Sequence, residues 1–128
     1  MPERTIQKIK IYGSHRGRRF VGRYYINISY ETWRTFDLKK FRTRVLCEIN
    51  SLFDKDQKSV FNGSESGYCI PHYEYNYATK EWIYTLEFSS QLVRSIGIRE
   101  GLYVDMLLTR IDKFGGNVVH IFPKISFI

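Results

Sequence analysis

The sequence has few of the residues from which covalent or metal-bound scaffolds are built. Its 128 residues include two cysteines, Cys47 and Cys69, whereas disulfide-stabilised domains carry several paired cysteines. We therefore expect two buried free thiols. A closed zinc site needs four ligands, but Cys69 and His72 supply a single pair, and His15 and His120 stand alone in the sequence. We expect neither a metal ion nor a cofactor.

Long apolar runs are also missing. The longest, residues 104–108 and 118–122, are interrupted by Asp105 and His120 and are far shorter than the roughly 20 residues that cross a bilayer. The first eight residues include three charged side chains, whereas a secretory signal would have an apolar run there. These features predict a cytoplasmic protein that does not associate with membranes.

The local motifs of the common enzyme classes are absent as well. There is no glycine-rich phosphate loop, no nucleophile elbow and no recognisable pair of acidic residues. The carboxylates Glu87 and Asp105 fall in strand-like segments, where we expect them to face solvent. The pattern favours a non-enzymatic protein. An active site assembled from distant residues would leave no local motif, so an enzyme stays open as an alternative.

What the sequence does have is aromatic content and an uneven positive charge. It is 43% hydrophobic and 16% aromatic, and its net charge is +7, so one domain of this length can bury a core. Residues 1–44 hold twelve Lys or Arg against three acidic residues, whereas residues 45–128 hold eight against ten. Such a cationic region attracts polyanions, and nucleic acid is the leading candidate partner.

The first half alternates strand-like and turn-like segments around one helix. We expect a strand at 5–12, a turn at 13–19 rich in glycine and arginine, and a strand at 20–28. Ser29 is a suitable N-cap for a helix over 30–36, with Trp33 and Phe36 facing the core. A strand at 41–53, a turn at 54–57 and a short strand at 58–61 follow, and residues 62–67 are expected to form a flexible linker.

The second half repeats this order. We expect a strand at 68–77 broken by Pro71, a turn at 78–81 and a strand at 82–88. Ser89 caps a helix that presents Val93 and Ile96 to the core and ends at Gly97. A strand at 102–111, a hairpin turn at 112–117 and a last strand at 118–127 complete the chain.

The two halves align without gaps at an offset of 60 residues. Tyr24, Ser29 and Arg34 match Tyr84, Ser89 and Arg94, and a one-residue slip then aligns the following strands. We interpret the pattern as an internal duplication. The sequence therefore predicts a mainly β fold with two short helices (α+β): a single compact domain of residues 1–128, with ββαββ halves at 1–61 and 68–128.

A family resemblance enters at residues 82–104. A strand there is followed by Leu92-Val93-Arg94, the helix end Ile96-Gly97-Ile98, then Gly101 and Val104. This segment resembles the AbrB/MazE/SpoVT family of swapped-hairpin DNA-binding domains, whose members are usually homodimers that interlock into one barrel. The resemblance implies that this chain, with two copies, forms a pseudo-dimeric swapped-hairpin (cradle-loop type) barrel as a monomer.

The same resemblance implies DNA binding through the hairpin that precedes the helix, where the family presents arginines. That segment is also where the positive charge peaks. We expect a transcription regulator that binds duplex DNA through Arg16, Arg18, Arg19 and Arg23, with outlying phosphate contacts from Lys8, Lys10 and Arg34.

Two other binding roles remain open. A protein-interaction adaptor could be built on the same barrel. RNA or single-stranded DNA could stack on tyrosines near the arginines, namely Tyr12, Tyr24, Tyr25 and Tyr30.

Overall fold

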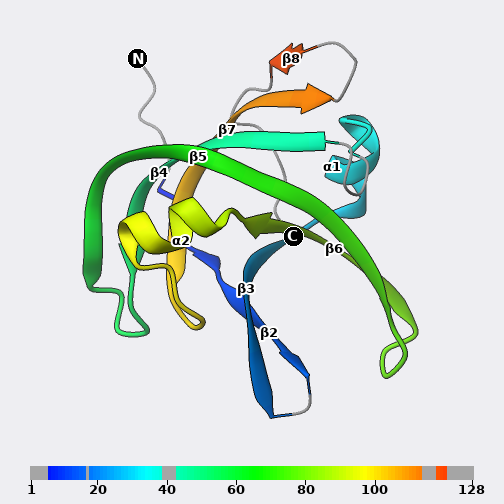
Figure 1. The fold of residues 1–128 in the computed structure, drawn as a ribbon, viewed down its shortest axis with the longest axis horizontal. Helices are drawn as coiled ribbons and strands as arrows, with labels where there is room; N and C mark the ends of the chain where they lie inside the picture. Colours follow the sequence, from blue (N-terminus) through cyan, green and yellow to red (C-terminus); the bar gives the residue numbers. More distant parts are fainter. Residues whose placement is uncertain (1–5, 17, 39–42, 114–117, 121–128) are drawn as a thin grey trace.

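A computed structural model describes residues 6–16, 18–38, 43–113 and 118–120, which are mainly β with two short helices, as expected. The strands form one antiparallel sheet in the order β1-β7-β4-β5-β6-β3-β2, with β8 paired to β7. This sheet curls into a nearly closed barrel (Figure 1). The elements are β1 (Ile9–Lys10), β2 (Tyr12–Arg16), β3 (Arg19–Ile28), α1 (Tyr30–Thr35), β4 (Thr43–Phe53), β5 (Ser59–Asn76), β6 (Glu81–Phe88), α2 (Ser90–Ile96), β7 (Tyr103–Lys113) and β8 (Val118–His120).

Most of the expected strands are confirmed, with shifted ends. The strand expected at 5–12 is instead divided at Ile11 into β1, which pairs with β7, and β2, which pairs with β3. β2 continues past Gly13 to Arg16, so most of the turn expected at 13–19 belongs to β2 and β3. The expected turn at 112–117 starts later, since β7 runs to Lys113. Residues 114–117 and the end of the last expected strand, 121–127, lie outside the described residues.

Both helices begin where the capping serines predict, and α2 also ends at the predicted Gly97. The Ser29 hydroxyl accepts a hydrogen bond from the Thr32 N–H at 3.1 Å, and the Ser89 hydroxyl accepts one from the Leu92 N–H at 3.4 Å. Each bond satisfies a backbone donor that has no partner within the helix. Gly97 ends α2 with φ +73°, a left-handed conformation that glycine adopts without steric cost.

The four helix residues expected to face the core do pack against it, but other helix residues are the buried ones. Thr32 and Leu92 are the buried residues of α1 and α2. The four residues expected to be buried are instead half-buried against the core: Trp33, Phe36, Val93 and Ile96. Because α1 and α2 have six and seven residues, fewer than two full turns of helix each, one side chain per helix reaches the interior.

The core lies inside the barrel and is drawn from both halves of the chain. Its buried apolar members are Ile11, Ile26, Ile28, Leu38, Val45, Cys47, Ile49, Leu52, Cys69, Leu86, Phe88, Leu92, Ile98, Val104, Met106, Leu108 and Ile111. Asp105 is also buried, at 2% exposure, so the expectation that it faces solvent is wrong. Its carboxylate accepts a hydrogen bond from the Gln7 N–H at 3.1 Å, which offsets the cost of burying it.

Residues 62–67 form part of a long strand and are not a linker. They lie inside the 18-residue β5, and Ser66 pairs with Glu48 of β4. The polar side chains that suggested a linker bond across the two strands: the Ser64 hydroxyl donates to the Glu48 carboxylate at 2.8 Å. Pairing with β4 thus outweighs the loop-like composition of this segment.

Pro71 does not break β5 either. It is buried and pairs with Leu86 of β6. Among the described residues, the β4–β5 partners end at Val45 and Cys69, and Pro71 pairs with β6 alone. The N–H that proline lacks is therefore not needed for pairing on the other side.

Gly67 is required where α2 crosses β5. A Cβ atom at this position would lie 2.4 Å from Cγ of Leu92, the one α2 side chain that reaches the core. The Ser89 N–H also donates to the Tyr68 carbonyl at 3.1 Å, which fixes the start of α2 over the same strand. The glycine lets the helix approach the sheet closely.

We expect Gly67→Ala to destabilise the protein by about 1–3 kcal/mol, because Leu92 must move to accommodate the added methyl group. Gly63→Ala is the matched control on the same strand, since its nearest contact would be 3.5 Å away on the Phe61 ring. Urea denaturation followed by circular dichroism measures both. In a Leu92→Ala background the cost of Gly67→Ala should largely vanish. Equal effects of the two glycine substitutions would contradict this packing account.

Two of the strand pairs that join the first half to the second have informative registers. Between β3 and β6, Ile26 pairs with Leu86. Between β4 and β7, Glu48 pairs with Leu107, and a register shift lies on either side of that pair. The extra residues at these shifts are Asn50 in β4 and Thr109 in β7.

Candidate nucleic-acid interface

The arginine-rich segment forms the hairpin of β2 and β3, which projects from the barrel (Figure 1). Between the pairs His15↔Phe20 and Gly13↔Tyr24, β3 has more residues than β2, so the ladder is irregular there. Gly22 lies in this stretch with φ +82°, a backbone conformation open to glycine at little cost. Such bulges increase the local twist and redirect the end of a hairpin.

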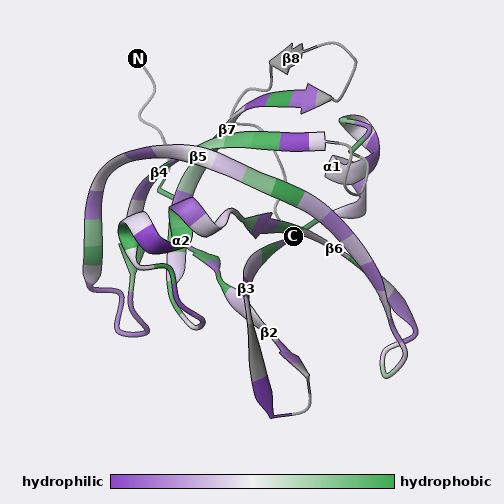
Figure 2. Cartoon of the chain, viewed as in Figure 1, coloured by the Kyte–Doolittle hydropathy of each residue, from purple (hydrophilic) through white to green (hydrophobic). Residues whose placement is uncertain are grey.

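All four arginines of the sequence prediction belong to the β2–β3 hairpin. Arg16 and Arg19 are cross-strand partners, and Arg18 lies in the turn between them. Arg18 and Arg19 are exposed, and Figure 2 shows β3 hydrophilic at the end that meets the turn. Within the described part of the chain, no ion pair joins Arg18 or Arg19 to a carboxylate. Both guanidinium groups are therefore available to an anionic ligand.

Arg23 differs from its neighbours because it has a protein partner. Its Nε lies 3.8 Å from Oε1 of Glu87 on β6, and its side chain is 63% exposed. The separation is long and the Arg23 side of the pair is exposed, whereas the Glu87 side chain is 27% exposed. Transfer of Arg23 to a phosphate group would therefore leave a partly buried carboxylate without this partner.

The three outlying basic residues do not form one group. Lys8 Nζ lies 4.9 Å from the centre of the Phe53 ring, and Lys10 Nζ lies 5.3 Å from that of Tyr12 at the base of the hairpin. Arg34 is exposed on α1, and in Figure 1 this helix and the hairpin turn lie at different ends of the molecule. Lys10 thus extends the basic hairpin, whereas Arg34 belongs to a different surface.

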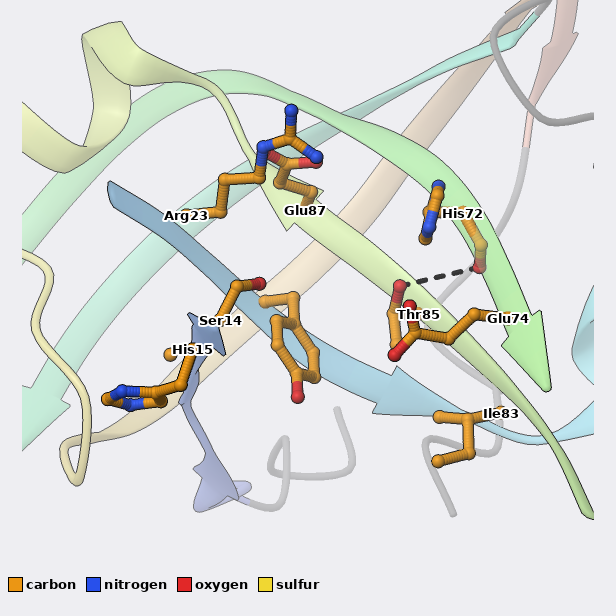
Figure 3. A pocket seen from close by; sticks show the side chains of 10 residues that line it. Ser14, His15, Arg23, His72, Glu74, Ile83, Thr85 and Glu87 are labelled. Atoms are coloured by element: carbon orange, nitrogen blue, oxygen red, sulfur yellow. Dashed lines mark hydrogen bonds and ion pairs between the residues drawn. The ribbon is translucent and has the colours of Figure 1, made fainter. Parts of the chain in front are cut away.

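A polar cleft at the foot of the hairpin was not foreseen from the sequence. Its volume is about 570 Å3, and it lies on the outer face of the sheet formed by β2, β3, β6 and β5 (Figure 3). Residues that alternate along β3, β5 and β6, together with three consecutive residues of β2, line it: Gly13, Ser14, His15, Arg23, Tyr25, His72, Glu74, Ile83, Thr85 and Glu87. The alternation of side chains in β6 could have indicated the cleft, because it places Ile83, Thr85 and Glu87 on one face of the strand.

Two ion pairs lie in and around this cleft. Nε2 of His15 lies 2.8 Å from Oε2 of Glu100, and Arg23 contacts Glu87. Burial raises the pKa of Glu87, and the Arg23 guanidinium opposes part of that rise. Burial also raises the pKa of Tyr25, with smaller contributions in the same direction from Glu74, Tyr12 and Glu100. The cleft is therefore partly desolvated and holds carboxylates, which suits the anchoring of Arg23 better than the binding of an anion.

The two cysteines are buried free thiols, as expected. Their Sγ atoms are 3.9 Å apart on the adjacent strands β4 and β5. The hydrogen bond with Cys47, together with burial, raises the pKa of the Cys69 thiol well above its ordinary value. A protonated, buried thiol is a poor nucleophile and a poor metal ligand.

In the portion of the chain that the structure covers, no group of three or more His, Cys, Asp or Glu side chains could hold a metal ion. None of the helices described there is long and apolar enough to cross a membrane. Comparison with protein-family models, curated proteins and solved structures finds no match to this chain. The resemblance to the AbrB/MazE/SpoVT family therefore remains a prediction that rests on sequence motifs.

The raised pKa of Glu87 predicts how the pH dependence of stability changes in a variant. Because the carboxyl holds its proton more tightly in the folded state, its contribution to stability falls as pH rises above the ordinary glutamate value of about 4.3. Glu87→Gln removes that fall. The quantity to compare is the melting temperature of Glu87→Gln minus that of the unchanged protein. We expect this difference to be larger at pH 7 than at pH 3.5.

Glu81→Gln is the control for this measurement, since Glu81 is an exposed carboxylate on the same strand. Differential scanning calorimetry at the two pH values gives the comparison. A relative melting temperature of Glu87→Gln that does not change with pH, or that is higher at pH 3.5, would contradict the desolvation of Glu87.

Proposed function

We propose that this protein binds duplex DNA through the β2–β3 hairpin and acts by binding rather than by catalysis, in the role of a transcription regulator. The observation that carries the proposal is a projecting two-stranded ribbon whose exposed charges are all positive. No acidic residue occurs between Tyr12 and Tyr30, whereas four arginines do. Arg18 and Arg19, at the end of the ribbon, are exposed.

The shape and chemistry of the hairpin both suit this ligand. The major groove of B-DNA admits a two-stranded β-ribbon. Guanidinium groups make charge-assisted and often bidentate hydrogen bonds to phosphate and to guanine. Arg18 and Arg19 would enter first, and Arg23 would leave Glu87 to contact the backbone nearer the barrel.

We also propose that the barrel is a pseudo-dimer of two related halves supplied by one monomeric chain. Two registers support this. Ile26 pairs with Leu86, the residue that matches it in the internal alignment, as a two-fold axis through that pair requires. In the β4–β7 pair, the extra residues Asn50 and Thr109 also match at the one-residue slip of the alignment. Under this arrangement the β5–β6 hairpin is the counterpart of the β2–β3 hairpin.

The experiment is a salt titration of duplex DNA affinity by fluorescence anisotropy. Each phosphate contact releases counterions and contributes about −0.9 to the log–log slope, so four engaged arginines predict a slope of about −3 to −4. Arg18→Glu with Arg19→Glu should weaken binding by at least tenfold at low salt and flatten the slope by roughly 2.

The matched control is Lys55→Glu with Lys58→Glu, which changes net charge equally at the exposed turn between β4 and β5. The two variants would lose duplex DNA affinity equally only if the net charge of the protein, and not the position of the charges, determined binding. If the folded Arg18→Glu, Arg19→Glu variant bound duplex DNA with unchanged affinity and slope, the hairpin would not be the binding site.

A further inference from the structure

A continuous group of aromatic rings covers one side of the β5–β6 hairpin and the adjoining surface of α1. We call it the aromatic face, and its members are Tyr30 and Trp33 of α1, Tyr73 and Tyr75 of β5, Tyr77 of the following turn, and Trp82 and Tyr84 of β6. Neighbouring ring centroids are 4.9 to 5.6 Å apart through the series Tyr30–Tyr84–Trp33–Tyr73–Trp82–Tyr75–Tyr77.

Much of this aromatic face is exposed. Tyr77 is 84% exposed, Tyr30 55%, Trp82 53% and Tyr73 37%. The barrel core contains residues such as Leu86 and Phe88, which lie further along β6 on the same side of the strand. The aromatic face therefore continues the apolar side of the hairpin beyond the barrel. Large exposed rings in contact with one another mark a binding surface.

The alternation of side chains keeps carboxylates away from this side of the hairpin. His72, Glu74, Ile83 and Glu87 line the cleft on the opposite side of the same two strands, as Figure 3 shows. Glu81 shares that side by its position in β6.

Cations flank the aromatic face at both ends. Arg34 lies four residues after Tyr30 and so on the same side of α1, and Lys80 lies in the turn at the end of the hairpin. Both residues are exposed. The nearest helix carboxylate, Glu31, is in the first turn of α1, where it interacts favourably with the helix dipole. Aromatic rings that lie between two basic residues suit a ligand in which planar groups alternate with negatively charged groups.

We propose that the aromatic face is a second binding site, which holds single-stranded DNA by stacking unpaired bases on its exposed rings. Stacking on aromatic side chains tolerates any base, and nearby cations neutralise the phosphates. The site does not depend on the proposed function of the β2–β3 hairpin.

The chain reports on this site without any label, because its two tryptophans, Trp33 and Trp82, both belong to the aromatic face. Titration with an oligothymidine of about 20 nucleotides should quench the tryptophan fluorescence in a saturable manner. The unchanged full-length protein is used, so this first result does not rely on any variant. Absence of quenching would overturn the proposal.

Variants then locate the site. Trp82→Ala and Tyr73→Ala should each weaken oligothymidine binding roughly 5- to 150-fold, as loss of one stacked base predicts, whereas Trp82→Phe should retain most of the affinity. Val60→Ala removes an exposed apolar side chain elsewhere on β5 and should have no effect. Circular dichroism checks that each variant is folded. Unchanged affinity in both alanine variants would exclude this face as the site.

Further arms distinguish the alternatives. Trp82→Ala should leave duplex DNA affinity unchanged, while Arg18→Glu with Arg19→Glu should leave the quenching by oligothymidine at saturation intact, so the two sites can fail separately. Oligouridine bound more than tenfold tighter than oligothymidine would overturn the assignment to DNA. A third outcome is that oligothymidine does not quench the fluorescence, while the protein self-associates with rising concentration and Trp82→Ala abolishes that association. This outcome would identify a protein interface and overturn the proposal.

Discussion

The pairing of β3 with β6 is the contact on which the rest of the structure depends. It joins strands that are far apart in the sequence, with Ile26 opposite Leu86 at its centre, and both residues are fully buried. A one-residue slip would turn every side chain of one strand to the other face, so the buried pair fixes the register. That register sets where both hairpins project, and it places Arg23 of one beside Glu87 of the other.

The two hairpins carry different chemistry on similar backbones. The β2–β3 hairpin is short and arginine-rich, whereas β5 and β6 form a longer hairpin that bears aromatic rings on one side and lines the cleft on the other. This difference contributes to the uneven charge of the sequence, since the hairpin holds four of the twelve basic residues that lie before position 45. If both proposals hold, one arm binds the phosphate backbone of a duplex and the other binds unpaired bases.

Local chemistry explains which parts could be predicted from the sequence. Ser29 and Ser89 fixed the helix starts, and Gly97 fixed the end of α2, because capping depends on residues close in sequence. Residues 62–67 were misread because their pairing with β4 is a tertiary interaction that composition does not encode. Likewise, the burial of Asp105 depends on Gln7, a residue 98 positions away.

The same distinction applies to the sites. The arginines of the β2–β3 hairpin are contiguous, so charge counting found them. The cleft joins the β5–β6 hairpin to β2 and β3, and the aromatic face joins the same hairpin to α1. Periodicity could place the residues of each strand on one of two sides, but it could not identify these distant neighbours. Tyr30 belonged to the tyrosines proposed for stacking near the arginines, and its ring contacts Tyr84 of β6.

The central claim, that one chain supplies both halves of the barrel, can be tested with a cross-strand disulfide. Asn27 and Thr85 are direct partners in the β3–β6 pair, so Asn27→Cys with Thr85→Cys places two thiols within bonding reach. After mild oxidation of the folded protein, non-reducing denaturing electrophoresis should show a disulfide-closed monomer of 15.3 kDa. A covalent dimer of twice that mass as the main product would show that β3 pairs with β6 of a second chain and would contradict the account.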